Sequence, residues 1–147
     1  MIILTWASFS TFRPNSRSVL LCNVPNSNIQ MKFVPLEINR ATDNTDVVES
    51  FKAAFAQNIF VGRDFEAQMP KRFDAWEAEL SSIFVRPVGE IEEFEVFLTY
   101  NMWFSALIGV RNFVFAFPGW DFNFEIFQRK GDSKDHLSGS GGLRTVK

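Results

Sequence analysis

The alternation of apolar and polar positions is clearest near the C-terminus, over residues 112–129. Pro118 and Gly119 suit the centre of a type II turn, because proline presets its φ angle and glycine accepts the positive φ that follows. A turn at this point would place Phe117 opposite Phe122 and align the neighbouring aromatic residues on one face. The pattern therefore predicts that this range forms a C-terminal β-hairpin at the centre of a sheet.

Three apolar runs in the first third of the chain are separated by turn-forming residues, as strands are. We expect strands over Ile2–Phe12, Ser18–Val24 and Ile29–Ile38. Two later segments have apolar residues at helical spacing. Asp46–Gln57 begins with a capping-box pattern, and Lys71–Ile83 follows a proline and repeats large apolar residues every three to four positions. Both segments are expected to be amphipathic helices that pack on the sheet.

Residues 91–108 fit two structures. Apolar residues alternate with acidic and polar ones as in a strand, and the aromatic and β-branched content agrees. In a helix, Glu90 and its acidic neighbours would suit the N-terminus and Gly109 the C-terminal cap. We favour a strand over Gly89–Trp103. The uncharged stretch Val96–Val110 is shorter than the roughly twenty residues that cross a bilayer, so we expect no membrane partner.

Together these segments predict an α+β fold, with a mostly antiparallel sheet of five to seven strands, two packed helices and a C-terminal β-hairpin. A chain of 147 residues is most economically one domain, which we place at residues 1–130. Residues 131–147 are polar and rich in Gly and Ser, which is typical of a flexible tail or a cloning remnant. We expect an interaction arm that a neighbouring chain holds, and whose removal leaves the fold intact.

Charge and cysteine content narrow the function classes. The net charge of −2, with both signs interspersed, gives no electrostatic footprint for nucleic acid. The single cysteine, Cys22, lies in an apolar run and suits a buried, inert thiol in a reducing compartment. The N-terminus lacks the basic region of a signal peptide. We therefore expect a cytoplasmic location in the producing cell.

The residue types that usually carry catalysis do not gather into a known set. The glycine cluster at residues 139–142 has no P-loop lysine, and one cysteine and one histidine are too few for a zinc site. A catalytic triad would have to use His136, in the polar tail. Glu90, Glu92, Glu93 and Glu95 could bind a divalent cation, but a strand would divide them between two faces and a helix would place them at a solvated N-terminus. We expect no enzyme activity, metal, cofactor or small-molecule substrate.

Phenylalanine is unusually frequent, with 18 in 147 residues. Each ring left in water forgoes about 2 kcal/mol of available burial. Because a chain of this size has a limited interior, we expect some rings to lie between protein subunits, in a homo-oligomer or a hetero-oligomer. The residues expected at such contacts are Trp103, Trp120, Phe127, Asp132, Leu137 and Leu143.

Residues Glu90–Trp103 read EIEEFEVFLTYNMW, in which a turn leads into a Phe-Glu-Val-x-Leu pattern that ends near an aromatic residue. This stretch resembles the late strand of contractile-phage tail-tube proteins and their baseplate relatives. The residues Arg13-Pro14-Asn15 look similar to the entry to the first strand in that family. The resemblance implies a sheet-rich subunit that packs in rings, with a helix on one side and no catalysis.

The leading hypothesis is a non-catalytic structural or assembly subunit of a phage or virus particle, of tail or baseplate type. It would act through aromatic and tail contacts with neighbouring chains, and it would be found in the virion as well as in the producing cell. The alternative is a small phage-encoded inhibitor or regulatory protein that binds a host enzyme. A subunit would form rings or large particles, whereas an inhibitor would stay monomeric or dimeric without its target.

Overall fold

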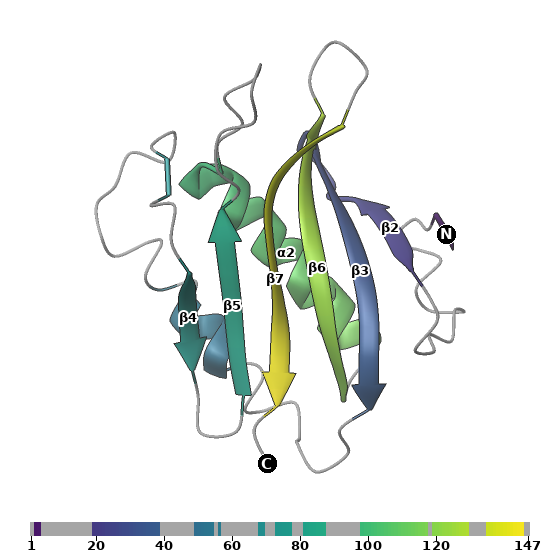
Figure 1. Cartoon of the computed structure of the whole chain (residues 1–147), viewed down its shortest axis with the longest axis vertical. Coiled ribbons are helices and arrows are strands. Elements are labelled where there is room, and N and C mark those ends of the chain that lie inside the picture. The colour runs from purple at the N-terminus through teal and green to yellow at the C-terminus, as the bar shows by residue number, and fades with distance from the viewer. Residues whose placement is uncertain are drawn as a thin grey trace.

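The structure is a computed structural model that describes residues 2–3, 19–38, 49–54, 56, 68–69, 73–77, 81–87, 98–117, 119–129 and 135–145. Within these residues the main feature is a seven-stranded sheet with the order β1-β2-β3-β6-β7-β5-β4 (Figure 1). Its neighbouring strands are antiparallel, except that β1 and β2 are parallel. The strands are β1 (Ile2–Ile3), β2 (Leu20–Asn23), β3 (Ile29–Ile38), β4 (Asp74–Glu77), β5 (Ser81–Pro87), β6 (Trp120–Arg129) and β7 (Asp135–Thr145).

Both described helices lie on one face of this sheet. Helix α2 (Tyr100–Ala116) crosses behind the central strands in Figure 1. A short helical segment, over residues 49–54 and 56, lies on the same face and is joined to β5 by the buried hydroxyl groups of Ser50 and Ser81, 3.0 Å apart. The architecture is therefore the expected α+β class, a mostly antiparallel sheet with two helices.

Aromatic rings fill the space between α2 and the sheet. Phe113 of α2 lies against Phe33 of β3, with ring centroids 4.5 Å apart and an interplanar angle of 15°. The Phe113 ring is also 4.6 Å from that of Phe122 on β6. Trp103 stacks on Trp76 of β4 at 5.6 Å. Such ring pairs add about 0.5–1.5 kcal/mol each beyond the burial of their area, so this layer holds α2 to the sheet.

Alternation along β3 shows how the sheet acquires two different faces. Met31 and Phe33 are fully buried toward α2, whereas Lys32 and Val34 are half-buried on the opposite face. The strand predicted over Ile29–Ile38 is confirmed with those bounds. Period-two alternation was therefore a reliable signal at this position, because one face of the strand meets the helices and the other does not.

Two further predictions agree with the described residues. The strand expected over Ser18–Val24 is confirmed as β2. The helix expected over Asp46–Gln57 is confirmed at residues 49–54 and 56. Of the strand expected over Ile2–Phe12, β1 covers only its first residues, and residues 4–12 lie outside the described part of the chain.

The hairpin predicted over Asn112–Arg129 is wrong in its first half, because residues 112–116 end helix α2. Thr99 caps this helix by accepting a hydrogen bond from the backbone N–H of Met102 at 3.2 Å. Apolar residues then recur every three to four positions, so the aromatic residues that suggested alternation also fit one helix face. Packing of that face on the sheet decided between the two periods. A C-terminal hairpin does form, but its strands are β6 and β7.

The strand favoured over Gly89–Trp103 is wrong for residues 100–103, which are helical. Residues 88–97 lie outside the described part of the chain. The helical alternative was also incomplete, because Gly109 is buried inside α2 and does not cap its end. The helix continues through Ala116, where Phe117 closes it with a backbone hydrogen bond to the Phe113 carbonyl at 2.9 Å.

The helix predicted over Lys71–Ile83 is also wrong. Residues 74–77 and 81–87 form strands β4 and β5, which pair antiparallel with Trp76 opposite Ile83. The helical spacing of large residues was coincidental, since Trp76 and Phe84 point to opposite faces of the sheet. The alternation along β5, where every second residue from Ser81 is buried, is the pattern that correctly indicates a strand.

The polar tail predicted over residues 131–147 is replaced by strand β7, which lies in the interior of the sheet between β6 and β5. Its glycines make this possible because the neighbouring strands leave no room for side chains. A Cβ at Gly141 would overlap the backbone oxygen of Phe84 and lie 2.7 Å from the Phe124 ring. A Cβ at Gly142 would lie 2.7 Å from the backbone oxygen of Phe122. The glycines therefore serve close packing, and the domain includes this segment.

Candidate functional site: the open face of the sheet

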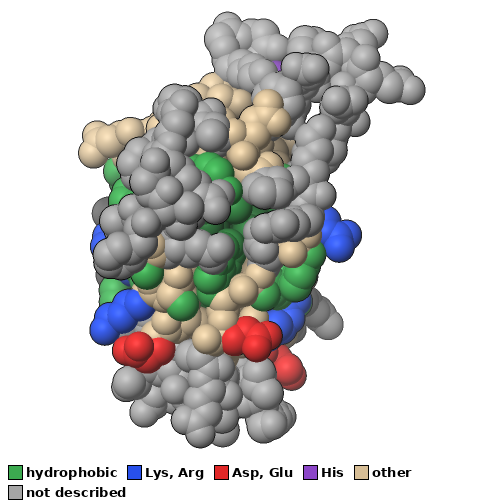
Figure 2. Space-filling view, turned by 90° about the vertical axis from the view of Figure 1, so that its left-hand side faces the viewer, with side chains coloured by type: hydrophobic (Ala, Val, Ile, Leu, Met, Phe, Trp, Pro, Cys, Tyr) green, Lys and Arg blue, Asp and Glu red, His purple; other side chains and the backbone are tan. Residues whose placement is uncertain are grey.

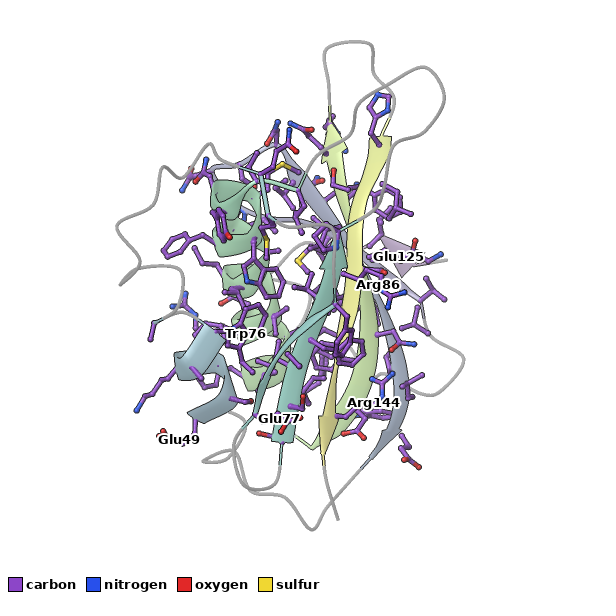
Figure 3. The ribbon with its side chains drawn as sticks, turned by 60° about the vertical axis from the view of Figure 1, so that its left-hand side comes forward. Glu49, Trp76, Glu77, Arg86, Glu125 and Arg144 are labelled. Atoms are coloured by element: carbon purple, nitrogen blue, oxygen red, sulfur yellow. The ribbon has the colours of Figure 1, made fainter. Side chains whose placement is uncertain are left out.

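The face of the sheet that points away from α2 is called the open face here. In Figure 3, Arg86, Glu125 and Arg144 project from it, whereas Trp76 points the other way, toward the helix. Strand register builds this face in rows, because paired residues on adjacent strands point to the same side. The residues that define it are Lys32, Val34, Glu37, Glu77, Phe84, Arg86, Asp121, Asn123, Glu125, Phe127, Leu137, Ser140, Gly142 and Arg144.

A groove of about 520 Å³ runs over the middle of the open face. Its floor lies along β7, where Ser140 and Gly141 leave little bulk between the side chains of β5 and β6. The remaining walls combine apolar and polar side chains, namely Val34, Phe84, Asn123, Phe124, Glu125, Leu137 and Arg144. A volume in this range accommodates a peptide segment or a small molecule.

Arg144 forms one end of the groove and is held in place on several sides. Its Nη1 donates to the backbone oxygens of Phe122 at 2.9 Å and Leu143 at 3.0 Å. Its Nη2 donates to the side-chain oxygen of Asn123, and its guanidinium carbon lies 5.2 Å from the centre of the Phe84 ring. A guanidinium has five N–H donors, and the described residues accept hydrogen bonds from three of them. The site therefore presents a preorganised cation.

The open face carries charges of both signs. Lys32 pairs with Glu125 across β3 and β6, with Nζ and Oε1 3.6 Å apart and side chains 28% and 35% exposed. Arg86 is exposed on β5, on the other side of Ser140 from Glu125. Arg144 adds a third cation, and strand register places the carboxylates Glu37, Glu77 and Asp121 on this face as well as Glu125. The open face therefore carries charges of both signs, and its charge alone does not select an acidic ligand.

The described residues bring together no set of metal ligands, since no group of three or more His, Cys, Asp or Glu occurs among them. Cys22 is buried on β2, and burial raises the pKa of its thiol to about 12. The thiol is therefore protonated at neutral pH and a poor nucleophile. This agrees with the buried thiol expected from the sequence. His136 lies on β7, opposite Gln128 of β6.

Two of the residues predicted at subunit contacts belong to the core. Trp103 and Leu143 are 0% and 1% exposed, so neither side chain can reach another chain. The Nε1 atom of the Trp103 indole has no hydrogen-bond partner within the described part of the structure. Trp120 is partly buried against the core, and Asp132 lies outside the described residues.

Phe127 and Leu137 are the predicted contact residues that the structure brings together. They are directly opposite each other on β6 and β7, and both are half-buried. The sequence reasoning missed Phe84, Arg86 and Arg144, which carry most of the chemistry of the groove. The alternation of β5 would have revealed the first two, had that segment been taken as a strand.

A second, smaller hollow lies on the helical side of the molecule. It measures about 170 Å³ and lies between the short helical segment and α2. Phe115, 59% exposed, forms part of its wall. Figure 2, which views the β4 side of the molecule, shows hydrophobic side chains gathered at mid-height, with charged ones at both edges and below them. The full lining is Phe51, Lys52, Ile83, Val110, Arg111, Val114 and Phe115.

In comparisons with known proteins, no family model, curated protein or solved structure matches this chain. Among the described residues, no helix has the length and apolar character required to cross a membrane. The chemistry of the open face is therefore the main guide to function.

Proposed function

We propose that this chain is a non-catalytic assembly subunit that contacts further copies of itself through the open face of its sheet. The observation that supports this most directly is the position of the described helices. Both cover one face, while the other carries a groove of about 520 Å³ lined by apolar side chains and fixed charges. A surface of this composition is typical of one that a protein partner covers.

The partly exposed apolar side chains agree with this function. Phe127 and Leu137 lie side by side on the open face, and Phe73, 51% exposed, has its ring 5.5 Å from that of Phe84. Contact with a second chain would remove this apolar area from water, at about 25 cal/mol for each Å² buried. Of the contact residues expected from the sequence, Phe127 and Leu137 are the ones that this proposal keeps. A particle subunit of phage tail or baseplate type, present in the virion, is the class that the sequence resemblance favours.

Sedimentation velocity over a micromolar concentration series tests the proposal. The wild-type chain should associate, and Ser140→Trp, which places a large side chain in the middle of the groove, should weaken association at least tenfold. The matched control is Glu49→Trp, which adds the same side chain at an exposed position on the helical side. Circular dichroism should show that both variants are folded. A wild-type chain that stays monomeric at every concentration, with no effect of Ser140→Trp, would overturn the proposal.

A further inference from the structure

We infer that two copies of this chain pack open face to open face about a two-fold axis that runs across the strands. The inference rests on the proposed function and specifies how the second copy is oriented. It uses described residues alone, and strand register fixes where each of them lies on the sheet.

The charged residues of the open face occupy two rows that run across the strands. The first is called the basic row, with two cations and one carboxylate, and its members are Lys32, Glu125, Ser140 and Arg86. The second lies four positions away along β5, β6 and β7. It is called the acidic row, with three carboxylates and one cation, and its members are Glu37, Asp121, Arg144, Ser82 and Glu77. Figure 3 shows Arg86 and Glu125 at one level of the sheet, and Glu77 and Arg144 at another.

An uncharged row separates these two. It is called the middle row, and its members are Val34, Asn123, Gly142, Phe84 and Ala75. Val34 and Phe84 are half-buried and form part of the groove wall. The open face therefore has an apolar centre with opposite net charges on its two sides.

This order of rows is complementary to itself. Rotation by 180° about the middle row places the basic row of one copy on the acidic row of the other, and it brings each middle-row residue to its own counterpart. Lys32 then faces Glu37 of the other copy, and the two Phe84 rings meet. On β7 the long side chain of Arg144 faces the short one of Ser140, so it enters the groove of the second copy.

The other way to stack the two faces is less favourable. A two-fold axis parallel to the strands would place the acidic row of one copy on the acidic row of the other, and like charges across an interface repel. Sheets that pack face to face keep their strand directions within about 30° of each other, so the rows stay in register under the first arrangement. Charge therefore selects the axis that runs across the strands.

Three of the charged side chains are free to make these contacts. Glu37, Glu77 and Arg86 are exposed in the single chain. The ion pairs formed among the described residues involve none of them. Contact with a second copy would therefore give them partners of opposite charge without breaking an ion pair within the chain.

Charge reversal with full-length chains tests the inference. Glu37→Lys and Lys32→Glu should each associate at least tenfold more weakly than the wild type in sedimentation velocity, because a two-fold axis repeats every repulsive contact. An equimolar mixture of the two variants should form heterodimers, because residues 32 and 37 then meet with opposite charges at both places. Glu49→Lys, at an exposed position on the helical side, is the matched control and should associate as the wild type does.

Cross-linking locates the axis. Val34→Cys and Ala75→Cys lie at opposite ends of the middle row, four strand spacings or about 19 Å apart. Both lie on the proposed axis, so a short bis-maleimide reagent should convert each variant mainly into a covalent dimer. The wild type, whose single thiol, Cys22, is buried, and Glu49→Cys should both remain uncross-linked.

The outcomes separate this inference from the proposed function. If Ser140→Trp prevents association, but the mixture of charge variants does not restore it and the two cysteine variants do not cross-link, the copies meet in another orientation. Only this inference is then overturned. If the wild type stays monomeric at every concentration, the proposed function is overturned as well.

Discussion

The two faces of the sheet differ although the same strands build both. On β6, Phe122 and Phe124 are 0% and 1% exposed against α2, while Asn123 and Glu125 between and beside them are half-exposed. The backbone is shared, and only the direction of each Cα–Cβ bond distinguishes the two sets. The face under the helices supplies the stability of the fold. Among the described residues, the open face is held mainly by polar contacts, such as the hydrogen bonds of Arg144 and the Lys32–Glu125 ion pair.

Strand β7 contributes to both the stability of the fold and the candidate site. It adds little bulk to either face, and its hydrogen bonds join the β6 side of the sheet to the β5 side. The same glycines that let Phe124 pack on one face leave the floor of the groove on the other. One segment therefore serves both stability and the candidate site.

Of the changes proposed here, removal of β7 should destabilise the fold most. A chain that ends at residue 134 leaves β5 and β4 without a hydrogen-bonded neighbour in the rest of the sheet. We expect circular dichroism and thermal melting to show no cooperative unfolding. The control chain ends at Thr145 and keeps the strand. A truncated chain that melts cooperatively would contradict the interior position of β7 and restore the idea of a removable tail.

Truncation of a side chain of α2 that packs on the covered face of the sheet should cost far more stability than truncation of an exposed side chain of the same helix. Phe113→Ala removes a ring that is 0% exposed, and we expect the free energy of unfolding to fall by about 3–5 kcal/mol. Phe115→Ala removes a ring that is 59% exposed, and its effect should stay within about 0.5 kcal/mol. Urea unfolding of both variants measures the contrast. Equal losses would mean that Phe115 is buried in solution, for example in an assembly.

Glycine-to-alanine substitution in β7 probes the close packing between the two faces. The Cβ of Gly141→Ala would overlap the Phe84 backbone oxygen and approach the Phe124 ring to 2.7 Å, so we expect a loss of about 1–3 kcal/mol. The neighbouring substitution Ser140→Ala, at an exposed position, should cost no more than about 0.5 kcal/mol. Denaturant titration compares them. If Gly141→Ala left the free energy of unfolding unchanged, β7 and its neighbouring strands would be able to move apart at no cost in stability.

The buried thiol on the covered face of β2 should make stability depend on alkaline pH. Burial raises the pKa of Cys22 from 9.0 to about 12, so the unfolded chain releases this proton first and stability falls between these two values. By pH 10 the wild type should have lost about 1.4 kcal/mol more than Cys22→Ala, relative to each protein at pH 7. Urea unfolding at both pH values measures this difference. Parallel losses in the two proteins would show that the thiol ionises normally in the folded state.

The ion pair of the open face should contribute least. Lys32 and Glu125 are partly exposed, and we expect a double-mutant cycle with glutamine to give a coupling of about 0.2–1 kcal/mol. The control pair, Lys52 and Glu49, is 3.4 Å apart with side chains 66% and 55% exposed, and its coupling should be smaller. Added salt should reduce both values. A coupling of several kcal/mol at Lys32 would mean that the open face, like the covered one, stabilises the fold.

Local patterns predicted some elements well and others poorly, for identifiable reasons. Ile29–Ile38 was predicted correctly because its two faces meet different surroundings and its alternation is therefore strict. Residues 112–116 were assigned to a strand because their aromatic residues fit a period of two as well as a helical one. Only packing on the sheet chooses between such periods. The same ambiguity misplaced β4 and β5.

The candidate site was predictable only in part. Phe127 and Leu137 were expected at contacts and do lie together on the open face. Arg144 was not expected, because its position depends on β7 pairing with β6, and its contacts with Phe122 and Asn123 join residues more than twenty positions apart. Strand pairing over such distances leaves little trace in local sequence, since each strand alternates in the same way whatever its neighbour.

The pattern of residue types was enough to predict the class of the fold, a chain rich in aromatic residues with alternating strands that require a covering layer. Which face is covered, and that the glycine-rich C-terminal segment is an interior strand, became clear only from the packing of distant residues. Glycine has no side chain, so its residue type does not indicate whether it will be buried or exposed. At Gly141 and Gly142 the information lies in the neighbouring rings and backbone oxygens, which occupy the space where a Cβ would be.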